Sequence, residues 1–201
     1  APRWVTCREA RDYAHLLRAR ADAIMVGRKT VEDDDPLLTC RLPGLESRSP
    51  RRYVLDSRFR TPPAAKLVAT AAEVPVTLIG AQDAPDPRLP SSVAIRRVEA
   101  DGGALSLPAV LRLLYQDGIT RLLIEGGPHV AGSFVAAGLV DEVIVARGVE
   151  TLGASGIPPL GDRGLDVFAD EERWQVHSMR RIGSDEVTVY RARNRFPETA
   201  A

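Results

Sequence analysis

The stretch from Arg121 to Arg147 constrains the fold more than any other part of the sequence, because two apolar runs flank a glycine turn and a helical pattern. Leu122–Ile124 and Val143–Val145 have the continuous apolar character of strands buried on both faces. Between these runs, Val130 and Phe134 fall on one helical face. The order predicts a strand–helix–strand unit, and hence an α/β fold.

The turn inside this unit is the first candidate site. Gly126–Pro128 places two glycines at the carboxyl end of the predicted strand and a proline suited to the first helical position. The amides of His129–Ala131 would then lack intrahelical partners and lie at the positive end of the helix dipole, where a phosphate is stabilised. A simple tight turn explains the glycines equally well, because the spacing to Gly132 does not match the G-x-G-x-x-G fingerprint.

The rest of the chain adds short strands, two helices and a terminal hairpin to this unit. The patterns predict helices at 6–20 and 106–117, strands at 23–27, 53–55, 66–69, 74–79 and 93–98, and hairpin strands at 174–182 and 186–192. A glycine- and proline-rich loop at 151–164 is long enough to suggest a functional role. We therefore expect one domain over residues 1–201: a mixed, mostly parallel sheet flanked by helices, with a C-terminal antiparallel hairpin.

Three consecutive aspartates, Asp33–Asp35, precede Pro36 and suggest either a metal site or a turn. The turn is favoured, because proline keeps the preceding residue out of helical geometry and aspartate is common in turns. The three histidines and two cysteines show no metal-ligand spacing. We predict no metal.

Charge and cysteine content limit the partners and the compartment. Lys plus Arg and Asp plus Glu both number 27, so the charge balance does not indicate nucleic acid or a membrane surface as a partner. Cys7 and Cys40 are the only cysteines, and no secretory or long apolar segment is present. Two free thiols in the cytoplasm are expected.

Five motifs taken together resemble the reductase domain of the bacterial bifunctional riboflavin-biosynthesis deaminase-reductases. They are WVTCREA at 4–10, ADAIMVG at 21–27, TVEDDDPLLT at 30–39, VLDS at 54–57 and EGGP at 125–128. The resemblance implies a dihydrofolate-reductase-like fold and a homodimer. It also implies that NADPH reduces the ribosyl group of 5-amino-6-(5-phosphoribosylamino)uracil to a ribityl chain.

The resemblance also assigns site residues, although no catalytic residue follows from it. Around NADPH it places Trp4, Thr30, Asp34, Ser57, Gly127, Pro128, His129, Val130, Ala131, Gly132 and Ser133. Around the pyrimidine it places Arg18, Leu38, Arg41 and Glu125. The two arginines can bind the substrate phosphate as charge-assisted forks, Glu125 can accept from amino or hydroxyl groups, and Asp34 is expected to orient groups. Taken one by one, such residues are more often structural: Arg18 a solvated helix arginine, Glu125 a strand-end carboxylate and Trp4 a core or edge aromatic.

Two departures from the family pattern affect the expected domain organisation. The S-L-D-G strand that normally precedes the tryptophan is absent, and so is the H-x-E and P-C-x-x-C zinc deaminase signature. We expect this chain to be the reductase portion of a longer protein fused to a zinc deaminase. The alternatives are a stand-alone relative, a related pyrimidine or pterin reductase, and a non-catalytic nucleotide-fold module that dimerises.

Overall fold

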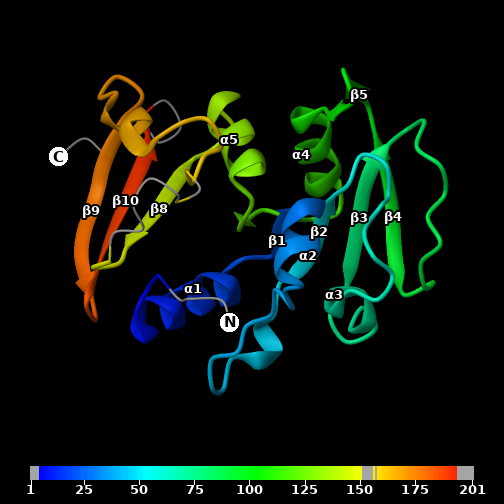
Figure 1. The fold of residues 1–201 in the computed structure, drawn as a ribbon, viewed down its shortest axis with the longest axis horizontal. Coiled ribbons are helices and arrows are strands. Elements are labelled where there is room, and N and C mark those ends of the chain that lie inside the picture. The colour runs from blue at the N-terminus through cyan, green and yellow to red at the C-terminus, as the bar shows by residue number, and fades with distance from the viewer. Residues whose placement is uncertain (1–4, 151–155, 157, 194–201) are drawn as a thin grey trace. The chain divides into compact units, whose positions relative to one another are not determined.

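The structure, a computed structural model, describes residues 5–150, 156 and 158–193, which form two compact units (Figure 1). One unit comprises residues 15–130, and the other comprises residues 1–14 and 131–201 as far as they are described. The expectation that they make up a single domain stays a prediction.

The unit of residues 15–130 is built on a five-stranded parallel sheet in the order β4-β3-β2-β1-β7. Its strands are β1 (Ala23–Gly27), β2 (Arg51–Leu55), β3 (Val76–Ala81), β4 (Val93–Val98) and β7 (Leu122–Ile124). Every residue of β1 is buried, as the continuous apolar run predicts for a central strand. The core of this unit lies around β1, β2 and β3.

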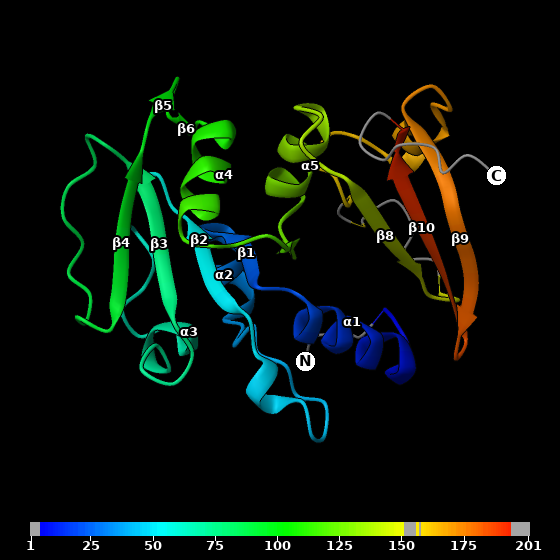
Figure 2. The same cartoon turned by 180° about the vertical axis from the view of Figure 1, so that it is seen from behind.

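Helices cover both faces of the parallel sheet, with α2 and α4 on opposite faces (Figures 1 and 2). The helices of the first part of the chain are α1 (Arg8–Arg20), α2 (Arg28–Asp34), η1 (Glu46–Arg48), α3 (Lys66–Ala69) and α4 (Leu107–Gln116), and a small hairpin of β5 (Ala100–Asp101) and β6 (Ala104–Leu105) precedes α4. The Ser106 hydroxyl caps α4 by accepting from the Ala109 amide at 3.4 Å. None of the helices in the described residues is long and apolar enough to cross a membrane.

The other unit contains a three-stranded antiparallel sheet in the order β8-β10-β9. Its elements are most of α5 (Pro128–Ala136), then β8 (Glu142–Arg147), η2 (Leu165–Ala169), β9 (Trp174–Ile182) and β10 (Asp185–Ala192). Phe168 packs edge-on against Trp174 and stacks on Tyr190, each at 5.0 Å between ring centroids. The buried carboxylate of Asp185 accepts from the Cys7 amide at 2.8 Å, which ties the start of α1 to the hairpin.

The predicted fold class is confirmed, including the helix–strand order and the C-terminal hairpin. The strand–helix–strand stretch, however, contributes to two sheets, because β7 pairs with β1 and β8 pairs with β10. The predicted strand at 66–69 is wrong, since these residues form α3. Asp35 accounts for this helix: its carboxylate accepts from the Lys66 amide at 2.8 Å and so caps a segment too short to be helical alone.

The aspartate stretch is likewise helical rather than a turn. Helix α2 continues through Asp34, and Asp35 ends it in a left-handed conformation with φ 41°. Aspartate tolerates this conformation better than most residues. Pro36 therefore restricts only the residue after the helix, so it does not prevent the helix from forming.

Candidate site at the carboxyl edge of the parallel sheet

The order of the strands places a topological switch point at the carboxyl ends of β1 and β7. From β1 the chain proceeds outward through β2, β3 and β4, and then returns to place β7 on the other side of β1. Ligands of open α/β sheets bind at such a switch point, outside the carboxyl ends of the strands. The segments that follow β1, β2 and β7 contain Thr30, Ser57 and Glu125, all of which were predicted to line the site.

The two glycines after β7 pack against the start of α2. Gly126 and Gly127 have φ values of 104° and 65°, which side chains rarely adopt. A Cβ at Gly127 would lie 3.0 Å from the Thr30 hydroxyl oxygen, and one at Gly126 would lie 3.1 Å from the Thr30 methyl group. The turn therefore brings bare backbone close to Thr30.

Helix α5 begins at Pro128, as predicted, so its first amides lie directly after this turn. Val130 packs against β1, since a Cβ at Gly27 would come within 2.8 Å of it. Packing explains why residue 132 is a glycine, because a Cβ there would clash with the carbonyl oxygen of Leu160. Of the predicted segment, only His129–Ala131 lie in the first turn after Pro128, and Ser133 lies one turn further along.

Two predicted substrate residues, Arg18 and Glu125, bind each other. The Arg18 guanidinium donates to both carboxylate oxygens of Glu125, and the distance from Nε to Oε1 is 2.8 Å. Its Nη1 also donates to the Thr39 carbonyl, at 3.0 Å. Their side chains are only 15% and 26% exposed. This two-point pair holds the carboxylate at the end of β7 in a fixed orientation.

A histidine that the sequence analysis did not select, His15, lies beside this pair. Its Nδ1 accepts from the Arg41 amide at 3.2 Å, and its backbone carbonyl accepts from the Cys40 thiol at 3.4 Å. Burial, and then the positive charges of Arg18 and Arg41, lower the pKa of His15 below 6.5. The only sequence signal for His15 is its position three residues before Arg18, on the same helical face.

The remaining predicted residues differ in their exposure to solvent. Leu38 is 3% exposed and belongs to the core of this unit, in a left-handed conformation with φ 56°. Arg41 is exposed, and Asp34 is exposed one helical turn beyond Thr30. Trp4 lies outside the described residues. The roles assigned to these residues stay predictions.

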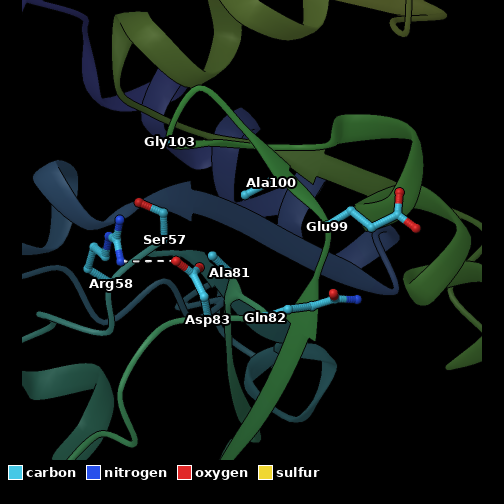
Figure 3. Close-up of a pocket in the computed structure, with 8 residues that line it drawn as sticks. All are labelled: Ser57, Arg58, Ala81, Gln82, Asp83, Glu99, Ala100 and Gly103. Carbon is cyan, nitrogen blue, oxygen red and sulfur yellow. Dashed lines mark hydrogen bonds and ion pairs between the residues drawn. The ribbon is translucent and has the colours of Figure 1, made fainter.

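A cavity of about 320 Å³ opens at the carboxyl ends of β2, β3 and β4, as Figure 3 shows. It is lined by Ser57, Arg58, Ala81, Gln82, Asp83, Glu99, Ala100 and Gly103. Arg58 Nη1 lies 3.4 Å from the Asp83 carboxylate. Ser57 was predicted to bind the cofactor, whereas Arg58 and Gln82 were not selected, although Arg58 directly follows the VLDS motif.

The turn that carries Ser57 and Arg58 is held in place by the buried Asp56. Its Oδ2 accepts from the amide and the hydroxyl of Thr61, at 2.6 and 2.8 Å. Phe59, with φ 52°, packs its ring over the backbone of Gly80, where even a Cβ would clash. Buried hydrogen bonds and packing thus fix the cavity wall that contains Ser57.

No group of three potential metal ligands occurs among the described residues. Two of the three aspartates after Glu32 pair with different lysines: Asp33 with Lys29 at 2.6 Å, and Asp35 with the ammonium of Lys66 at 3.4 Å. These two carboxylates therefore have structural roles, as ion-pair partners of lysines.

The comparison with known families decides the classification, because residues 1–188 match the RibD C-terminal domain family. This chain belongs to that family. It is 35% identical over 180 residues to the 2,5-diamino-6-ribosylamino-4(3H)-pyrimidinone 5′-phosphate reductase of Methanothermobacter thermautotrophicus, covering 88% of this chain and 82% of the relative. It is 31% identical to the riboflavin biosynthesis protein RibD of Escherichia coli, covering 90% of this chain and 52% of that protein.

A solved structure agrees with this membership. The diaminohydroxyphosphoribosylaminopyrimidine deaminase/5-amino-6-(5-phosphoribosylamino)uracil reductase from Thermotoga maritima aligns with a TM-score of 0.76 at 25% identity. The alignment covers 94% of this chain and 50% of that one. The chain thus spans about half the length of the RibD relatives that it matches.

Proposed function

We propose that this chain is an NADPH-dependent reductase of riboflavin biosynthesis that reduces 5-amino-6-(5-phosphoribosylamino)uracil to its ribityl product. The observation that carries the proposal is that two separate groups of polar side chains lie along the parallel sheet. Glu125, Arg18 and Arg41 lie near β7 and β1, while the cavity with Ser57 lies at β2, β3 and β4. The names of the relatives supply the reaction class.

The residues present fit an extended dinucleotide. Three strand spacings separate β7 from β3 and four separate β7 from β4, which is about 14–20 Å at about 4.7–4.9 Å each and comparable to the length of such a cofactor. The bare backbone of Gly126–Gly127 and the first turn of α5 would hold the phosphates beside Thr30, and Ser57 would hold the other end. NADPH supplies the hydride when it is bound, and Asp34 is proposed to orient groups near Thr30.

On the substrate side, we propose roles for Arg18 and Arg41 that differ from those that the sequence analysis predicted. Arg18 uses Nε, Nη1 and Nη2 on Glu125 and Thr39, so we assign it to holding the carboxylate. Glu125 would accept from amino or hydroxyl groups of the pyrimidine, and the exposed Arg41 would bind the ribose phosphate.

A second substrate is supported by the relative from Methanothermobacter thermautotrophicus, which is named as the reductase of 2,5-diamino-6-ribosylamino-4(3H)-pyrimidinone 5′-phosphate. The decisive experiment measures NADPH oxidation by the full-length protein with each phosphorylated pyrimidine in turn. We expect turnover with the 5-aminouracil compound to be the faster of the two. Faster turnover of the diamino compound would replace the proposed substrate, and no turnover of either would favour a non-catalytic module.

Replacing Gly127 with alanine tests the proposed phosphate cradle. Gly127→Ala should weaken NADPH binding about tenfold, because the new Cβ occupies the approach beside Thr30. Gly118→Ala is the matched control: its φ is also positive, at 81°, but nothing lies within 4 Å of a Cβ there. Both variants should lose about 1 kcal/mol of stability from left-handed strain. If calorimetry gave equal NADPH affinities for Gly127→Ala and Gly118→Ala, Gly127 would not be part of the cofactor site.

Replacing Arg41 tests the phosphate contact. Arg41→Ala should raise the KM for the phosphorylated pyrimidine about ten- to a hundredfold, because a charge-assisted contact of about 1.5–3 kcal/mol is lost. The KM for NADPH should stay nearly constant. Arg48→Ala, which removes an exposed arginine from the same segment, should change neither constant. An effect on NADPH alone would exchange the two halves of the site.

We further propose that the full-length protein is a cytoplasmic homodimer in which a zinc deaminase domain is fused to this reductase portion. The support for the fusion is that the RibD relatives are about twice as long as the part that this chain matches. An upstream strand is also proposed, since β7 is an edge strand in the described part of the parallel sheet.

A further inference from the structure

We propose that His15 is a positioning residue for substrate binding, which holds the backbone of residues 39–41 so that Arg41 is presented to the phosphate of the pyrimidine. This inference rests on the proposed function of the site. It adds to that function a residue that no motif selected.

The segment at 39–41 is attached to α1 at three consecutive residues. The Thr39 carbonyl accepts from Arg18 at 3.0 Å, the Cys40 thiol donates to the His15 carbonyl at 3.4 Å, and the Arg41 amide donates to His15 Nδ1 at 3.2 Å. A further hydrogen bond joins the Cys40 amide to the Ser49 hydroxyl at 3.0 Å. The contact to Nδ1 is made by Arg41 itself, and it uses a side-chain acceptor that substitution can remove.

The same turn of α1 contacts both residues that are proposed to bind the substrate, Glu125 and Arg41. Arg18, one turn after His15 on α1, binds Glu125, while His15 binds the amide of Arg41. A displacement of His15 would therefore move the proposed phosphate ligand and leave the carboxylate in place. This separation predicts an effect on substrate binding without an equal effect on the cofactor.

Protonation state determines whether the contact can form. Nδ1 can accept a hydrogen bond from the Arg41 amide only in the neutral imidazole, because both ring nitrogens are donors in the cation. The groups that face the ring are Arg18 and Arg41, which with burial lower its pKa, and the Thr39 carbonyl and Glu125, which raise it. The folded protein thus favours the neutral form. The neutral imidazole of His15 therefore contributes stability above the pKa of about 6.5 that it has in the unfolded chain. This contribution is lost as the pH falls through the lower pKa that His15 has in the folded protein.

The experiment compares wild type, His15→Ala and His15→Asn in the full-length protein. At pH 7.5, His15→Ala should raise the KM for the phosphorylated pyrimidine about tenfold, while kcat and the KM for NADPH change less than about twofold. His15→Asn should recover most of the loss, because its Oδ1 can accept from the Arg41 amide in place of Nδ1.

The pH profile separates positioning from packing. Wild type should bind the pyrimidine more weakly at acid pH, through protonation of the substrate phosphate, whose second pKa is about 6, and of His15, whose pKa in the folded protein lies below 6.5. His15→Asn should retain only the phosphate part of this loss. Identical acid limbs in wild type and His15→Asn would overturn the proposal, as would a His15→Ala variant that loses affinity for both substrates equally.

Hydrogen exchange keeps this inference distinguishable from the proposed function. Exchange of the Arg41 amide should be at least about tenfold faster in His15→Ala and close to wild type in His15→Asn. If wild type reduced neither pyrimidine, the function would be wrong, and the exchange of the Arg41 amide would still decide whether His15 holds the segment. Unchanged exchange in His15→Ala would refute the positioning role.

Discussion

Arg52→Ala should lower the free energy of unfolding by about 3 kcal/mol, because a buried arginine holds several carbonyl groups that would lose their donor. Arg52 is fully buried on β2. Its guanidinium donates to the Leu37 carbonyl at 3.0 Å, to the Thr70 hydroxyl and carbonyl at 2.9 Å each, and to the Val74 carbonyl. It therefore joins the segment after α2 to the segment between α3 and β3.

Burial lowers the pKa of Arg52 to about 10, so the side chain still carries its charge at neutral pH. Loss of the burial cost offsets part of the lost hydrogen bonding, which is why we expect about 3 kcal/mol rather than the sum of the contacts. Thermal unfolding should show a fall in Tm of about 6–12 °C.

Arg51→Ala is the matched control, because Arg51 is exposed on the same strand and its side chain donates to one carbonyl, that of Asp117, at 3.1 Å. It should cost less than about 1 kcal/mol. Arg52→Met, which keeps much of the volume, should recover less than half of the loss if the carbonyls dominate. Wild-type stability in Arg52→Ala would show that water satisfies these carbonyls.

Glu125→Gln should lower kcat/KM for the pyrimidine by about a hundredfold to a thousandfold, equivalent to about 2.7–4.1 kcal/mol. The amide keeps the shape but removes the charge that Arg18 binds at two points and that the substrate groups would contact. NADPH affinity should change less than about twofold, because the cofactor is assigned to other residues. Steady-state kinetics and calorimetry measure the two quantities separately.

The pairing with Arg18 can be tested by a double-mutant cycle. The quantity compared is the loss of kcat/KM for the pyrimidine, expressed as a free energy. Arg18→Gln combined with Glu125→Gln should lose at least about 1 kcal/mol less than the sum of the two single variants, since the second change removes a contact that the first has already broken. Glu142→Gln is the control: it breaks an exposed cross-strand pair with Arg191 and should have little effect. Additive effects of Arg18 and Glu125 would mean that they act independently.

The sequence alone determined the elements whose stability is local. The apolar run of β1, the Ser106 cap of α4, the glycine turn before α5 and the hairpin of β9 and β10 were all predicted. Periodicity, capping and turn stereochemistry depend on residues that are near one another in the chain, so they can be evaluated without a fold. The same reasoning, extended by the family resemblance, selected Thr30 and Gly127, which the structure brings together.

Tertiary structure decided the features that depend on distant partners. Residues 66–69 form a helix because Asp35, 31 positions away, caps it. Arg18 binds Glu125 across 107 positions, a contact that its residue type and its place on α1 did not indicate. His15 was missed for the same reason, since its partner Arg41 is 26 positions away. Such contacts form only after the intervening chain has folded, and no local pattern specifies them.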